Sequence, residues 1–146
     1  MTTVLHSQAH VRWDCTYHLV FAPKYRKKVL FGLIRNVLGQ IFRELARQKG
    51  IEIVEGTIKV DHVHMMLRIP PKHSVSSIVG FLKGKSAILL HNRFAKRKSI
   101  FQKEFWARGY FVRTTGLDQE MVQEYIRKQI EDDQHNDGNP QMEFQW

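Results

Sequence analysis

The stretch VDHVHMMLRI, residues 60–69, carries two histidines separated by one apolar residue inside a run that predicts a β-strand. Side chains alternate between the two faces of a strand, so His62 and His64 are expected on one face, with Val63 and Met65 on the other. The apolar face is suited to pack on a core. Two imidazoles on the opposite face can bind a single divalent metal ion. This strand therefore predicts a core on one side of a sheet and a site on the other.

The composition of the chain is that of one ordinary globular domain, spanning residues 1–146. Hydrophobic residues make up 42% of the sequence and charged residues 25%, which is typical of such a domain. The apolar runs are too short to cross a bilayer, so a membrane is not an expected partner. The single cysteine, Cys15, cannot form a disulfide within the chain and favours a reducing cytoplasm.

The charge balance is strongly basic. Lys and Arg number 23 against 14 Asp and Glu, which gives a formal net charge of +9. This balance points to a polyanionic partner, most often a nucleic acid, but a basic housekeeping enzyme has the same balance, and charge alone does not decide between them. The cations gather in two segments between predicted elements, residues 24–28 and 93–98. Such clusters suit contact with phosphates better than scattered charge does.

The order of predicted elements indicates the fold class. It is strand, helix, strand, strand, helix, strand, helix, and its first six members form the split βαβ pattern. We therefore predict an α+β, ferredoxin-like fold: a four-stranded antiparallel sheet with two helices on one face, plus a C-terminal helix. The predicted ranges are a loose arm over 1–10, strands over 12–22, 51–58, 60–69 and 106–115, helices over 33–48, 74–90 and 118–133, and an irregular tail over 136–146.

The last predicted helix carries an unusual polar pair. Tyr125 and Gln129 lie one turn apart on the side that also presents Val122 and Ile126. An inward-facing amide needs a partner, and a metal held by the two histidines can supply one. Two imidazoles and an amide oxygen suit Mg²⁺ or Mn²⁺, and also Zn²⁺. The alternative, a boundary tyrosine beside a hydrogen-bonded edge glutamine, stays open at this point.

Five short motifs occur in a fixed order along nearly the whole chain. They are KYR (24–26), DHVH (61–64), LKG (82–84), GYF (109–111) and YIRKQ (125–129). In this ordered set the chain resembles the single-tyrosine transposases of the HUH (His-hydrophobic-His) nuclease superfamily, which small bacterial insertion sequences encode. Asp61, which opens the second motif, is expected on the core side of its strand, as a turn or secondary residue and not as a ligand.

The resemblance implies a specific chemistry and assembly. Family members cleave and rejoin single-stranded DNA at the ends of a mobile element, with a divalent metal and without ATP. They recognise subterminal hairpins and act as homodimers, in which the tyrosine helix of one subunit can complete the histidine site of the other. For this chain it implies a cytoplasmic protein, associated with the nucleoid when bound to DNA.

Residue roles follow from the same resemblance. Tyr125 is expected to be the nucleophile that forms a 5′-phosphotyrosine, with His62, His64 and Gln129 as ligands of Mg²⁺ or Mn²⁺. The remaining basic residues are expected to contact DNA, namely Lys24, Arg26, Lys27, Lys28, Lys83, Lys85, Arg93, Lys96, Arg97 and Lys98.

Other classes of protein share parts of this pattern. A domesticated relative that nicks hairpin DNA without moving an element has the same chemistry. A binding module of the RNA-recognition type has the same order of elements, but it presents aromatic residues where His62 and His64 stand here. A histidine-triad hydrolase needs a third histidine where Met66 stands. Replication initiators and relaxases with the same histidine pair are usually much larger.

Overall fold

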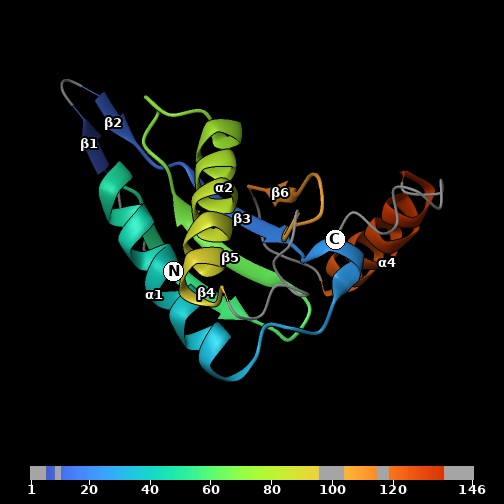
Figure 1. Cartoon of the computed structure of the whole chain (residues 1–146). Coiled ribbons are helices and arrows are strands. Elements are labelled where there is room, and N and C mark those ends of the chain that lie inside the picture. Colours follow the sequence, from blue (N-terminus) through green and yellow to red (C-terminus); the bar gives the residue numbers. More distant parts are fainter. Residues whose placement is uncertain (1–5, 9–10, 96–103, 115–118, 137–146) are drawn as a thin grey trace.

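The computed structural model describes residues 6–8, 11–95, 104–114 and 119–136. A small hairpin comes first, followed by the elements of the main sheet and its helices (Figure 1). The elements are β1 (His6–Gln8), β2 (Val11–Trp13), β3 (Thr16–Phe21), the 3₁₀ turn η1 (Lys24–Arg26), α1 (Gly32–Lys49), β4 (Glu52–Ile58), β5 (Val63–Arg68), α2 (Val75–Arg93), β6 (Phe111–Arg113) and α4 (Gln119–Asn136).

The main sheet has the strand order β4-β5-β3-β6, and every neighbouring pair is antiparallel. Helices α1 and α2 pack against each other on one side of this sheet (Figure 1). This arrangement confirms the predicted ferredoxin-like α+β fold. The central strands β3 and β5 carry the core on that side, because Leu19, Phe21, Val63 and Met65 are all almost fully buried.

The signals that begin and end the two helices act as the sequence predicts. The Ser74 side chain accepts a hydrogen bond from the Ser77 backbone N–H, 3.1 Å away, and caps the start of α2. Helix α1 ends at Gly50, which has a left-handed backbone with φ of +67°. These two residues therefore fix where α2 begins and where α1 ends.

The opposite face of the sheet is partly covered by helix α4. Val122 and Ile126 of this helix pack on Val20 of β3, and Phe111 and Tyr125 border the contact. This cluster is separate from the main core, and α4 also contacts η1 at the same end of the molecule (Figure 1). Helix α4, which carries Tyr125, is therefore held by this small apolar contact with β3 and by its contact with the η1 turn.

Three predicted elements differ from the structure. The strand expected over 12–22 is divided, and its first part pairs with residues 6–8, which were expected in the loose arm. The strand expected over 106–115 is reduced to β6, because Gly109 bends the chain with φ of +80° and the Trp106 side chain turns into the core. Its indole N–H donates to the Ser86 hydroxyl over 3.0 Å.

Two substitutions on α2 test which face of this helix supplies the core. Leu82 is fully buried, whereas Leu89 on the same helix is 42% exposed. We expect Leu82→Ala to lower the free energy of unfolding by about 2–5 kcal/mol, because it leaves a cavity beneath the helix. Leu89→Ala should change it by no more than about 0.5 kcal/mol. Urea unfolding at one protein concentration measures both, and equal losses would contradict the placement of α2.

Candidate active site

His64 lies on β5, on the face that α4 partly covers. It pairs with Val20 of β3 and with Thr57 of β4, and its ring centroid is 5.9 Å from that of His18. Burial lowers the pKa of His64, and the nearby His18 and His62 lower it further, while Glu55 acts in the opposite direction. A neutral imidazole is the form that can bind a metal ion, and a lowered pKa favours that form.

His62 stands one residue before β5, in the turn that follows β4. The expectation that His62 lies inside the strand is therefore wrong. It is still close enough to His64 to lower the pKa of that residue. The Lys59 backbone N–H donates to the His62 carbonyl over 2.8 Å, which fixes the turn. His62 Nδ1 lies 2.9 Å from a carboxylate oxygen of Asp61. This contact leaves Nε2 as the nitrogen available to a metal, as in many carboxylate–histidine pairs.

Asp61 connects the histidine turn to η1. Its side chain is buried, and its second carboxylate oxygen accepts a hydrogen bond from Arg26 Nε over 2.6 Å. Burial alone raises the pKa of this carboxyl, but the hydrogen bonds from His62 and Arg26 outweigh burial and hold the pKa below its usual value. Asp61 lies in the turn before β5, and its contact with Nδ1 orients His62, which is a secondary role.

Tyr125 of α4 has a hydroxyl oxygen that is buried without a hydrogen-bond partner among the described residues. Its ring lies 5.9 Å from that of Phe111, and both border the cluster around Val20. Val20 pairs with Phe111 on one side and with His64 on the other. Because residues directly opposite in a ladder share a face, Tyr125 packs on the same face that carries His64.

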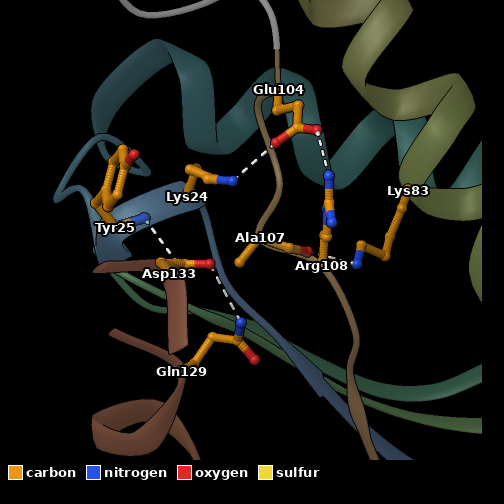
Figure 2. A network of polar contacts seen from close by, with 8 residues as sticks. All are labelled: Lys24, Tyr25, Lys83, Glu104, Ala107, Arg108, Gln129 and Asp133. Carbon is orange, nitrogen blue, oxygen red and sulfur yellow. Dashed lines mark hydrogen bonds and ion pairs between the residues drawn. The ribbon is translucent and has the colours of Figure 1, made fainter. Parts of the chain in front are cut away.

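Gln129 and Asp133 form a polar contact next to this tyrosine. The Gln129 amide nitrogen donates to one Asp133 carboxylate oxygen over 3.4 Å, and the other oxygen accepts from the Tyr25 backbone N–H over 3.1 Å (Figure 2). Figure 2 shows the Gln129 amide oxygen pointing away from Asp133. Asp133 lies far from Tyr25 in the sequence, and no sequence pattern indicated that it takes part in the site.

The donor set fits a hard or borderline divalent metal ion by its chemistry. Among the described residues, His62 uses Nδ1 for its contact with Asp61, burial lowers the pKa of His64, and the Gln129 amide oxygen is not used by Asp133. Nitrogen and oxygen donors of this kind suit Mg²⁺, Mn²⁺ or Zn²⁺. Within the part of the chain that the structure describes, no three His, Cys, Asp or Glu side chains form a metal-binding group.

Two of the lysines predicted to contact DNA point into the protein. Lys24 is buried and its ammonium group pairs with Glu104 over 2.9 Å. Lys83 donates to the carbonyls of Ala107 and Gly109, both over 2.7 Å, and burial lowers its pKa to about 8 while Asp133 acts against that shift. Both ammonium groups are engaged within the protein in this structure, and DNA contact by either lysine stays a prediction.

The other predicted DNA contacts have varied positions. Arg26 is engaged by Asp61, and Lys27 is half-buried. The side chains of Lys28, Lys85 and Arg93 are exposed. Lys96, Arg97 and Lys98 lie outside the described residues. DNA contact through the exposed cations stays a prediction.

The environment of Tyr125 predicts an unusual titration. Burial raises the pKa of its hydroxyl well above the usual value, and the negative charges of Asp133 and Asp132 raise it further. We expect the difference in ultraviolet absorbance between wild type and Tyr125→Phe to show no tyrosine ionisation at about pH 10 in the folded protein. In denaturant, the difference should show the ionisation of one tyrosine at that pH. Ionisation near about pH 10 in the folded state would contradict the burial of this hydroxyl.

Comparison with known proteins places this geometry in a family. Residues 11–129 match the family model described as "Transposase IS200 like". The transposase for insertion sequence element IS200 of Salmonella typhimurium is 48% identical over 128 residues, which cover 87% of this chain and 84% of that protein. The ISDra2 transposase TnpA of Deinococcus radiodurans is 31% identical over 119 residues, which cover 80% of this chain and 85% of that protein.

Solved structures show the same fold. A transposase candidate from Deinococcus radiodurans superposes with a TM-score of 0.78 at 31% identity, covering 85% of this chain and 97% of that one. A REP-associated tyrosine transposase bound to a REP hairpin superposes with a TM-score of 0.54 at 14% identity, covering 81% and 68%. Since the family model spans most of the chain and the fold agrees, this protein belongs to the IS200-like family of single-tyrosine transposases.

Proposed function

We propose that this transposase cleaves and rejoins single-stranded DNA at the ends of an insertion sequence through a 5′-phosphotyrosine on Tyr125. One observation carries the proposal: the Tyr125 hydroxyl is buried on the same face of the sheet as His64, and it has no hydrogen-bond partner among the residues that the structure describes. A buried hydroxyl with no hydrogen bond is uncommon in a native protein and calls for an explanation. A reacting phosphate as its missing partner supplies one.

The chemistry balances without an energy source. The Tyr125 oxygen forms a bond to the scissile phosphorus, the bond to the 3′ oxygen breaks, and the released 3′ oxygen takes up a proton. The phosphotyrosine keeps the energy of the phosphodiester, so a 3′-hydroxyl can attack it in reverse and reseal a strand. Since burial raises the pKa of Tyr125, this residue enters the reaction protonated and its proton has to leave during the attack.

Three side chains of this chain are proposed to hold Mg²⁺ or Mn²⁺: His62 through Nε2, His64, and Gln129 through its amide oxygen. A divalent ion bound by these residues would polarise the phosphate and stabilise the charge that develops on it. The protein contributes the orientation of His62 by Asp61 and the burial that lowers the pKa of His64. Both contributions exist before any DNA binds.

The proposed partner is a single-stranded DNA hairpin at the element's ends. The solved REP-associated tyrosine transposase, which has the same fold, is bound to a REP hairpin. The net charge of +9 and the exposed cations Lys28, Lys85 and Arg93 support phosphate contact here. No helix in the described residues is long and apolar enough to span a membrane. We place the protein in the cytoplasm, with the nucleoid when bound to DNA.

The proposed assembly is a homodimer in which the tyrosine helix of one subunit completes the histidine site of the other. The attachment of α4 supports this idea, because it packs on the sheet through Val122 and Ile126, apart from the main core. A helix held by so small an apolar contact can be exchanged between two copies at little cost, since the same contact forms in either arrangement.

Substitution of the nucleophile tests the reaction. We expect Tyr125→Phe to bind hairpin DNA as wild type does, yet to form no covalent adduct with labelled single-stranded DNA and Mg²⁺. Its stability should be unchanged or slightly higher, because the lost hydroxyl has no partner. Tyr17→Phe, on the helix-covered side of β3, is the matched control and should keep the adduct. An adduct that survives in Tyr125→Phe on denaturing gels removes Tyr125 from this role.

Mixed dimers test the shared site. His64→Ala and Tyr125→Phe should each be inactive alone, because each lacks one half of the machinery. If sites form between subunits, mixing the two variants assembles one intact site in half of the dimers and restores part of the cleavage. Size-exclusion chromatography of each variant provides the control for dimer formation. Mixtures that stay inactive while both variants dimerise would contradict exchange of the helix.

A further inference from the structure

Asp133 is a buried acidic residue that the proposed reaction does not use. Only 1% of its surface is exposed, although it lies near the end of α4. Asp132, the residue before it, is exposed. Its carboxylate accepts from the Tyr25 backbone N–H over 3.1 Å and from the Gln129 amide over 3.4 Å (Figure 2). Burial of a carboxylate is costly unless its hydrogen bonds are satisfied, so its position calls for a role.

The turn that Asp133 contacts has an unfavourable backbone. Tyr25 has φ of +58° and Arg26 has φ of +52°, so two consecutive residues other than glycine occupy the left-handed region. Such a conformation persists only where surrounding contacts hold it. The hydrogen bond from the Tyr25 amide to Asp133 is one of these contacts, and it comes from the tyrosine helix.

The same turn reaches the histidine pair. Arg26 follows Tyr25 and binds Asp61 through its Nε, and Asp61 binds His62 through Nδ1. A continuous path of polar contacts therefore runs from Asp133 on the tyrosine helix, through the η1 turn, to the first of the two histidines. The path joins the two halves of the proposed site, which lie about 60 residues apart in the sequence.

We propose that Asp133 is a positioning residue that sets the tyrosine helix, and the Gln129 amide in particular, relative to the histidine pair. The proposal rests on the function proposed above. A carboxylate can only accept hydrogen bonds, so it takes the NH₂ group of Gln129 and leaves the amide oxygen for a metal. An asparagine at the same position can still accept from Tyr25. However, its own NH₂ would draw the Gln129 oxygen toward itself and away from the metal.

The test compares Asp133→Asn with Asp132→Asn, which removes the same charge from an exposed neighbour. We expect Asp133→Asn to weaken Mn²⁺ binding by the hairpin-bound protein about 10- to 100-fold, measured by electron paramagnetic resonance, and to slow adduct formation. Binding of the hairpin itself should not change. Asp132→Asn should match wild type in Mn²⁺ affinity. Equal Mn²⁺ affinities in the two variants, with wild-type cleavage intact, would overturn the inference and leave the proposed function standing.

Hydrogen exchange keeps the inference testable if Asp133 variants fail to fold. In the wild type, the Tyr25 amide should exchange much more slowly than an exposed loop amide, because it is bonded to Asp133. Exchange at the rate of an exposed amide would overturn the positioning role without any substitution. A wild type that forms no adduct at all contradicts the proposed function instead, and the Tyr25 measurement does not depend on that result.

Discussion

The antiparallel pairing of β3 with β5 is the constraint on which the rest of the structure depends. Its register sets Val20 opposite His64 and Leu19 opposite Met65. Because side chains alternate, the same two strands give Leu19 and Met65 to the core beneath α1 and α2, and Val20 and His64 to the other face. A slip of one residue would bury the histidine and expose the core, so the burial that stabilises the fold also fixes the site.

The site is then completed by polar contacts that tie distant segments together. Asp61 holds His62 and Arg26, and Asp133 holds Tyr25 and Gln129. Each carboxylate is buried and accepts hydrogen bonds from two sides, so each one fixes two neighbouring elements at once. With these hydrogen bonds in place, α4 keeps its position without a large apolar core between it and the sheet. This explains how a helix with a small apolar contact can still present Tyr125 to a defined face.

Much of the fold could be predicted because local rules govern it. The alternation of residues 63–69, the cap at Ser74 and the glycine at 50 have the structures that their patterns indicate.

The site could be predicted only in part by the same reasoning. A two-residue period placed His62 inside the strand, but its contact with Asp61 belongs to a turn. Charge clustering could not show that Lys24 and Lys83 point inward, because their partners lie 80 and 24–26 residues away. His18 could have been identified as a neighbour of the histidine pair. Its alternation with Leu19 puts it on the sheet face that carries His64, and the two rings are close in the structure.

The most direct measurement is the identity of the residue that DNA modifies. Wild-type protein would be incubated with Mg²⁺ and single-stranded DNA carrying the element's own end, and the adduct would be digested and sequenced by mass spectrometry. We expect a 5′-linked phosphate on Tyr125 and a free 3′-hydroxyl on the released strand. A phosphate on another residue, or cleavage that leaves both products free of protein, would contradict it.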